Sequence, residues 1–278
     1  MKKIISLALV AIMLVCSLAM FASCGDDTIM IGVQAGTTGE YFVNGDPDWG
    51  FDGIEGYEAK GYSNGGLAVT DMKNGAIDYV IIDKAPAIQL KKAISGIKVI
   101  DIELTEETYA FGVDKKQADL LNAINVILAT KQNEIKNIID KYAKGEGIVA
   151  IESAKKDLDK ADKQLVVATN AAFAPFEYKD GNKFAGIDIE IMALVARELN
   201  LELVIEDMEF DSVVTSVGIN GVDVAAAGLS VNEERAKSVN FSSSYYDAAQ
   251  VLIVPESCKD FDGCKTAEDV LNKLAELK

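Results

Sequence analysis

One short stretch near the carboxyl end of the chain most constrains the fold. Apart from Asp223, residues 222–227 are small and apolar, which is typical of a buried strand, and Gly228 allows a turn. Ser230 and Asn232 are candidate caps for a helical turn that carries Arg235. Strand, turn and helix in this order are the unit of α/β folds. Free N–H groups at the helix start and one arginine suit a carboxylate. The alternative is a capped surface helix with a solvated arginine.

The beginning of the chain predicts a secretion signal. Lys2 and Lys3 precede an apolar run, 4–21, and Ala-Ser-Cys closes it at Cys24. Phe-Ala-Ser-Cys resembles a bacterial lipobox, in which the cysteine is lipidated and becomes the first mature residue. A transmembrane anchor is the alternative. We expect residues 1–23 to be removed and the mature protein to be extracytoplasmic and anchored to the membrane by the lipid on Cys24.

The mature composition excludes several kinds of protein. Removing Lys2 and Lys3 takes the formal charge from −17 to −19, which disfavours nucleic acid as a partner. The absence of histidine excludes Ser-His-Asp and Cys-His catalysis and the commonest metal ligand. We expect no metal and no cofactor. Cys258 and Cys264 either form a disulfide, as exported proteins often do, or remain two thiols.

Two further strand ends suggest ligand contacts. The strand 28–34 leads into Gly36, Thr37 and Thr38, where a turn and a helix start could form a second anion cradle. The Gly-Lys-Ser/Thr of a phosphate loop is missing. Asp83 ends another strand and could receive an ammonium group, because open α/β sheets bind ligands at the carboxyl ends of their strands. A glycine turn with a threonine cap, and an aspartate that caps the next helix, are the alternatives.

The middle of the chain predicts helices, then a linker, then a second strand–helix series. Residues 116–142 carry apolar stripes that suit a core, and 148–164 is charged and poorly amphipathic, as in a linker. The next strand, 165–169, is followed by two aromatics. Phe173 could present a flat wall to a ligand, whereas Phe176 is expected in the core.

Several segments resemble the polar amino-acid-binding proteins of bacterial ABC importers, solute-binding protein family 3. In the second half these are Val-Ala-Thr-Asn-Ala-Ala-Phe-Ala-Pro-Phe-Glu-Tyr at 167–178, Gly-Ile-Asp-Ile-Glu at 186–190, and 226–235. Segments 31–40 and 78–83 resemble the same family. The resemblance implies a two-lobed α/β fold of the type II periplasmic-binding-protein kind, with the ligand in the cleft between the lobes.

The two halves stand in reversed order relative to the family. The resemblance therefore implies a circularly permuted chain. Such a permutation is physically allowed, because termini of compact domains often lie close together. Lobe 2 is expected to combine 28–105 with 256–278, and lobe 1 to be continuous over 107–254, with the linker 148–164 inside it. The crossings between the lobes are expected within 102–113 and 246–256. A domain-swapped dimer of complementary halves is an alternative to a monomer.

The resemblance also implies a role for each matching residue at the carboxylate of an amino acid. Arg235 would hold it through paired hydrogen bonds. Gly228 and Ser230 would add backbone and hydroxyl contacts, and Thr37 and Thr38 would close on it from lobe 2.

Four more residues would contact the rest of the ligand. Asp83 would take the α-ammonium group. Phe173 and Phe210 would form walls around the side chain, and Asn170 would touch its distal end. A cation, an acid and aromatic walls together match a zwitterion.

The expected function is that of a lipid-anchored solute-binding protein that captures a polar amino acid and delivers it to the permease of an ABC importer, without chemistry. One alternative is a dehydratase-type enzyme on the same fold, for which Glu177 is the acid we can name. Others are a non-transport sensor or a rearranged relic that no longer functions. A binder shows saturable binding without turnover, an enzyme consumes its ligand, and a relic does neither.

Overall fold

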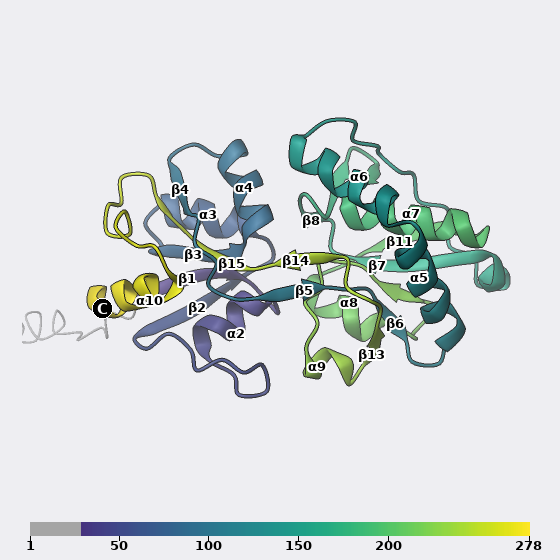
Figure 1. Cartoon of the computed structure of the whole chain (residues 1–278), viewed down its shortest axis with the longest axis horizontal. Coiled ribbons are helices and arrows are strands. Elements are labelled where there is room, and N and C mark those ends of the chain that lie inside the picture. Colours follow the sequence, from purple (N-terminus) through teal and green to yellow (C-terminus); the bar gives the residue numbers. More distant parts are fainter. Residues whose placement is uncertain (1–28) are drawn as a thin grey trace, which may run out of the picture.

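The computed structural model describes residues 29–278, which form two α/β lobes joined by two extended segments (Figure 1). The expected α/β class is confirmed. The predicted signal peptide and Cys24 lie outside the described residues. Within 29–278 there is no helix with the length and hydrophobicity that crossing a membrane would require.

Lobe 2 is built on a five-stranded sheet. Its strands are β1 (Ile29–Gln34), β2 (Tyr57–Tyr62), β3 (Tyr79–Asp83), β4 (Ile97–Ile100) and β15 (Gln250–Pro255), in the spatial order β2-β1-β3-β15-β4. β1 pairs in parallel with β2 and β3, whereas β15 runs antiparallel between β3 and β4. Parallel neighbours place the carboxyl ends of β1 and β3 at the same edge of the sheet, which faces the other lobe (Figure 1).

Helices pack on this sheet and bury its apolar side chains. They are α2 (Thr38–Asn44), α3 (Gly65–Lys73), α4 (Lys84–Ala93) and α10 (Ala267–Leu277). Thr266 caps α10, since its hydroxyl accepts from the Asp269 N–H at 3.1 Å. Val270 and Leu274 on one face of α10 pack in a common cluster with Leu252 of β15. The last segment of the chain is therefore part of the core of lobe 2.

Lobe 1 has a second five-stranded sheet, in the order β11-β7-β12-β6-β13. These strands are β6 (Gly112–Asp114), β7 (Gln164–Thr169), β11 (Glu202–Asp207), β12 (Val224–Ala225) and β13 (Val239–Phe241). A small antiparallel sheet adds β8 (Ala172–Phe173), β9 (Glu177–Asp180) and β10 (Lys183–Ala185). The helices are α5 (Ala118–Thr130), α6 (Gln132–Lys144), α7 (Ile187–Leu199), α8 (Phe210–Ser216) and α9 (Glu233–Ala236).

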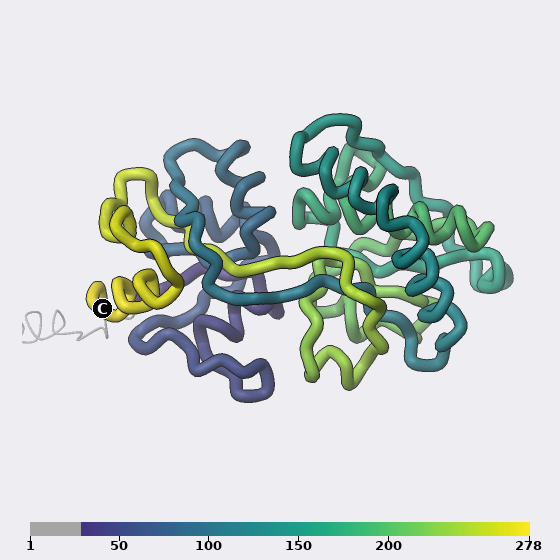
Figure 2. Tube along the Cα trace, viewed as in Figure 1, coloured from purple at the N-terminus to yellow at the C-terminus, as the bar shows by residue number. Residues whose placement is uncertain are grey.

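Two short strands carry the chain between the lobes. β5 (Glu107–Tyr109) and β14 (Tyr246–Ala248) pair antiparallel and lie side by side across the gap between the sheets (Figure 2). Both lie inside the crossings that were predicted. Because the chain passes between the two sheets in this ribbon, a bend within it would move the lobes relative to one another, so it suits a hinge.

One predicted boundary is wrong. Ending lobe 1 at residue 254 would place β15 in lobe 1, but β15 pairs with β3 and β4 in the middle of the lobe 2 sheet. The physical reason is that Val251 to Val254 are all completely buried, and a strand buried on both faces belongs in the interior of a sheet. The crossing therefore ends at Ala248, before β15.

The predicted linker between α6 and β7 is packed along lobe 1. Ile151 pairs with Phe184 of β10, and the Ala154 N–H donates to the Leu203 carbonyl at 2.8 Å. The segment ends in a short 3₁₀ helix, η2 (Leu158–Lys163). Backbone hydrogen bonds hold this segment against lobe 1. It is not a helix with one apolar face, which explains why its sequence lacks an amphipathic pattern.

The two ends of the described chain lie together on lobe 2. Ile29 of β1 pairs with Tyr57, and the Tyr57 hydroxyl donates to the Leu274 carbonyl at 2.7 Å. Lys278 forms an ion pair with Glu55 at 2.9 Å. This proximity is what a circular permutation requires.

The predicted disulfide is not formed. Cys258 and Cys264 are both free thiols, and the Cys258 thiol donates to an Asp260 carboxylate oxygen at 3.4 Å. Each cysteine follows its own backbone turn, which begins at Pro255 in one case and at Phe261 in the other. Short sequence spacing alone does not align two Cβ atoms for a disulfide.

Candidate functional site

A small cavity between the lobes gathers most of the predicted ligand residues. Its volume is about 10 Å³, and it is lined by Gln34, Thr37, Thr38, Asp83, Phe173, Phe210, Gly228, Ser230 and Arg235. Eight of the nine residues predicted from the sequence therefore meet at one place. The ninth, Asn170, is hydrogen-bonded to Gln34, which the sequence analysis did not single out.

Arg235 is the cation of this cavity. It is only 8% exposed, and its guanidinium donates to the Ser230 carbonyl at 2.9 Å and, across the lobes, to the Gly36 carbonyl at 3.1 Å. Its Cζ atom lies 5.0 Å from the ring centre of Trp49 and 5.3 Å from that of Phe210. Burial lowers the pKa of Arg235 to about 10, so the group stays charged at neutral pH.

The local sequence explains how Arg235 is positioned. Asn232 caps α9, since its side-chain oxygen accepts from the Arg235 N–H at 2.8 Å. Ser230 was the other predicted cap, but its hydroxyl instead donates to Glu107 of the crossing strand β5. The capping prediction is thus confirmed for Asn232 and wrong for Ser230.

A polar network links Ser230 to the crossing strands and to lobe 2. Thr38 at the start of α2 donates to the Ser230 hydroxyl at 3.3 Å. Glu107 also accepts from Gln250 at 3.0 Å and from Thr105 at 2.7 Å. Both oxygens of Glu107 therefore have donors within the protein.

Thr37 directs its hydroxyl away from the helix that it precedes. It donates to the Gln34 carbonyl at 2.7 Å and makes no side-chain cap on α2. The cap that was the alternative to a ligand contact is therefore absent here.

Asp83 is the acid of the cavity. It ends β3, is 5% exposed, and accepts from the Tyr109 hydroxyl of β5. It makes no side-chain cap on α4, so its alternative role is wrong. Burial raises the pKa of Asp83 to about 7, and the charge of Glu107 adds to the shift, whereas hydrogen bonds from Tyr109 and Gln250 oppose it.

Asn170 and Gln34 form an amide pair across the lobes. The Gln34 amide nitrogen donates to the Asn170 side-chain oxygen at 3.0 Å, and the Asn170 amide nitrogen donates to the Met208 carbonyl at 2.8 Å. The side-chain oxygen of Gln34 is buried and has no hydrogen-bond partner among the described residues. A buried acceptor without a donor is costly, so this oxygen is suited to accept from a ligand.

Two of the predicted aromatic residues, Phe173 and Phe210, line the cavity. Phe173 is buried and stacks on Phe176 with ring centres 5.9 Å apart, and Phe176 is in the core. Gly228 leaves room for this wall, because a Cβ atom there would lie 2.9 Å from the Phe173 ring. Phe210 faces it as a second lining residue at the start of α8.

The lobes are closed on one another at this site. Gly36 has φ +73°, and a Cβ atom there would lie 1.8 Å from a carboxylate oxygen of Asp211 in the other lobe. Only glycine allows both this conformation and this approach. A cavity of about 10 Å³ holds at most one water molecule. An amino acid can therefore enter only if the lobes move apart.

Glu177, the acid named for the enzymatic alternative, does not line the cavity. It lies on β9, is completely buried, and its carboxylate oxygens have no hydrogen-bond partner among the described residues. Burial, together with the charges of Asp188 and Asp83, raises its pKa well above the usual range. Buried in this way, it is not placed to act on a molecule in the cleft.

The site also contains residues that sequence reasoning missed. Gln34 ends β1 at the same sheet edge as Asp83, so the strand-end rule that selected Asp83 could have found it. Trp49, Tyr109 and Gln250 had no such signal, since a loop, the crossing strand β5 and the start of β15 bring them to the site only in the folded protein.

Known proteins share segments with this chain. Residues 165–274 match the model of the bacterial extracellular solute-binding proteins, family 3. The arginine-binding extracellular protein ArtP of Bacillus subtilis (strain 168) is 32% identical over 136 residues, covering 47% of this chain and 53% of that protein. The chain thus spans about half the length of this curated relative.

Two solved structures are also similar in sequence. The arginine-bound form of domain 1 from TmArgBP is 30% identical, covers 44% of this chain and 99% of that chain, and has a TM-score of 0.29. An ancestral arginine-binding protein bound to glutamine is 35% identical, covers 30% of this chain and 38% of that chain, and has a TM-score of 0.29.

The family match runs from β7 to α10 and includes six of the residues at or beside the cavity between the lobes, namely Asn170, Phe173, Phe210, Gly228, Ser230 and Arg235. Residues 165–274 are therefore similar to the bacterial extracellular solute-binding proteins, family 3, and the similarity to ArtP extends over 47% of the chain.

Proposed function

We propose that the protein captures a polar amino acid between its lobes and delivers it to an ABC importer. The observation that carries this proposal is the pair of opposite charges in one cavity. Arg235 and Asp83 are both buried and both line the space between the lobes. A cation for a carboxylate and an acid for an ammonium group match the two charges that every free amino acid carries.

Binding would proceed by opening and closing of the lobes. Direct hydrogen bonds now join lobe 2 to lobe 1, namely Thr38 to Ser230, Gln34 to Asn170, and Arg235 to Gly36. An amino acid that replaces these bonds with its own contacts touches both lobes only in the closed form, so it stabilises that form. The ribbon of β5 and β14 is the hinge.

The location and partners follow from the same proposal. The signal sequence and Cys24 would place the protein outside the cytoplasm with a lipid anchor. The closed form would be what the importer permease recognises. The relatives are named as arginine-binding, which supports an amino-acid ligand and supports binding without turnover.

A ligand screen on residues 25–278 tests the proposal. Thermal unfolding is measured with each of the twenty amino acids and with ornithine, citrulline and cystine. A ligand at 100 times its dissociation constant should stabilise the protein by about 2.7 kcal/mol. We expect one or a few amino acids to raise the melting temperature, and NMR to recover them unchanged. A cooperative melt that no amino acid shifts would contradict the proposal, and a consumed ligand would favour the dehydratase-type enzyme.

We also propose that the chain is a circular permutation of the family order. The adjacent ends of the described chain on lobe 2 and the segment 148–163 laid along lobe 1 support this. A rewired protein tests it, in which Lys278 is joined to Ile29 by a short Gly-Ser linker and new ends are placed after Gly147, in an exposed turn. We expect the rewired protein to bind the same amino acid with a dissociation constant within about threefold, because the contacts at the cavity do not change. Loss of cooperative unfolding in the rewired protein would contradict the permutation.

A further inference from the structure

The cavity has no charged group left over to pair with a charge on the side chain of the ligand. Among its lining residues, Arg235 and Asp83 are the two that carry ionisable groups of opposite sign. In the proposed function they pair with the carboxylate and the ammonium group of the amino acid. A third charge on the ligand side chain would then be buried without a counter-charge, which is strongly unfavourable.

A further carboxylate beside the cavity, that of Glu107, is already occupied. Glu107 accepts from Ser230 through one oxygen and from Gln250 and Thr105 through the other. It is therefore engaged in holding the hinge and the Ser230 turn, and a cationic side chain would have to displace these donors to use it.

The amide pair at the distal end has a defined donor and acceptor pattern. If a ligand separates Gln34 from Asn170, it faces two acceptors, the side-chain oxygens of these residues, and one released donor, the Gln34 amide nitrogen. The Asn170 nitrogen remains bonded to the Met208 carbonyl, which fixes how Asn170 is oriented. A complementary group must supply two N–H donors and one C=O acceptor.

Common charged side chains do not have this pattern. A carboxamide or a ureido group carries both N–H donors and a C=O acceptor. A guanidinium or an ammonium group has donors alone, so the released Gln34 nitrogen would have no acceptor. A carboxylate has acceptors alone, so both side-chain oxygens of the amide pair would lack donors.

We propose that this protein selects an amino acid whose side chain ends in a neutral carboxamide or ureido group, such as glutamine or citrulline, over arginine, lysine and glutamate. Asn170 and Gln34 are the residues that determine this specificity. The inference rests on the proposed function, since it needs the backbone charges of the ligand to occupy Arg235 and Asp83.

The competing site for a cationic side chain is a hollow beside the cavity. It has a volume of about 670 Å³, shares Thr38 and Ser230 with the cavity, and is lined by Glu103, Glu106, Glu107 and Asp247 among others. If the ligand side chain lay in this hollow, the protein would prefer a cationic side chain, whatever residue stands at position 170. This difference allows a decisive test.

The test compares ligands of nearly equal shape and different charge. Isothermal titration calorimetry at pH 7.5 measures the dissociation constants of citrulline and arginine, and of glutamine and glutamate. We expect the neutral member of each pair to bind tighter by about tenfold or more. Asn170→Asp should reverse the order of citrulline and arginine, because it adds the missing counter-charge. Gln34→Glu should act in the same direction from the other lobe.

Asn122→Asp is the matched control, since Asn122 is exposed on α5. It should leave every preference unchanged, and thermal melts show whether each variant is folded. Tighter binding of arginine than of citrulline by the unmodified protein, or a preference that neither Asn170→Asp nor Gln34→Glu alters, would overturn the inference while amino-acid binding stands. Absence of binding to every amino acid tested would instead be a failure of the proposed function.

Discussion

Replacing Arg235 by alanine is expected to weaken amino-acid binding by about 100-fold or more. Removing one partner of a desolvated, hydrogen-bonded charge pair typically costs about 2–5 kcal/mol, and about 2.7 kcal/mol corresponds to 100-fold. Arg235 is buried between the rings of Trp49 and Phe210, so water would not replace the lost guanidinium effectively. Calorimetry with the ligand found in the screen measures the effect.

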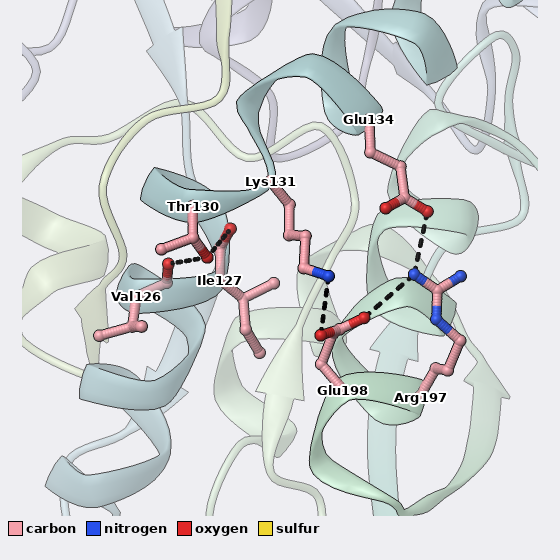
Figure 3. A network of polar contacts seen from close by, with 7 residues as sticks. All are labelled: Val126, Ile127, Thr130, Lys131, Glu134, Arg197 and Glu198. Atoms are coloured by element: carbon pink, nitrogen blue, oxygen red, sulfur yellow. Dashed lines mark hydrogen bonds and ion pairs between the residues drawn. The ribbon is translucent and has the colours of Figure 1, made fainter.

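The sequence contains a matched control, because its only other arginine is Arg197. Figure 3 shows that Arg197 contacts Glu134 and Glu198 and that Lys131 reaches the same Glu198. The Arg197 side chain is 59% exposed, and surface ion pairs contribute little. Arg197→Ala should therefore leave the dissociation constant within about twofold.

A second variant separates binding from folding. Arg235→Lys keeps a positive charge but cannot form two parallel hydrogen bonds with a carboxylate. We expect it to unfold cooperatively and still to bind at least about tenfold more weakly. If Arg235→Ala is folded and retains its affinity within threefold, then Arg235 does not hold the ligand and the assignment of this cavity fails.

Strand ends explain how much of the site could be predicted. Asp83, Phe173 and Gly228 each follow or end a buried strand, and the geometry of α/β sheets brings such positions to one edge. Local signals identify these positions without knowledge of long-range contacts. The cleft itself is formed by two such edges that face one another.

The remaining contacts depend on pairing over long distances in the sequence. Gln34 meets Asn170 across 136 positions, and no local pattern specifies that two neutral amides will be partners. The predicted end of lobe 1 was wrong for a related reason. An apolar strand such as Gln250–Pro255 fits the middle of either sheet, so its sequence does not say to which lobe it belongs. The disulfide between the two cysteines could not be decided from the sequence, because a sequence spacing does not fix a Cα separation.

Buried carboxyl groups are expected to make the protein more stable at pH 5 than at pH 8. Burial raises the pKa of both Asp83 and Asp188 to about 7. A carboxyl group with a folded pKa above its unfolded value binds a proton more tightly in the folded state. The free energy of unfolding therefore rises as the pH falls through about 7, by about 1.4 kcal/mol per pH unit and per group.

The pH range from 5 to 8 isolates this effect. The chain has no histidine, so no imidazole titrates in that range. Hydrogen bonds from Tyr62 and then Lys60 lower the pKa of Asp71, and Lys136 lowers that of Asp140, so their contribution is lost only as the pH falls below about 4. Thermal unfolding at pH 5, 6, 7 and 8 should show stability that rises by about 2–3 kcal/mol per buried group over this range.

Asp188→Asn should remove the contribution of one buried group, about 2–3 kcal/mol between pH 8 and pH 5. Asp188 accepts from the Gly228 N–H at 2.9 Å and from the Tyr245 hydroxyl at 2.5 Å. Asparagine can keep both contacts, since its oxygen accepts from Gly228 and its nitrogen can donate to a reoriented Tyr245 hydroxyl. The exposed Asp119→Asn on α5 should leave the slope unchanged. A stability that is flat or falls from pH 8 to pH 5 would mean that these carboxylates are ionised in the folded protein, and Asp83 would then be ready to receive an ammonium group without losing a proton.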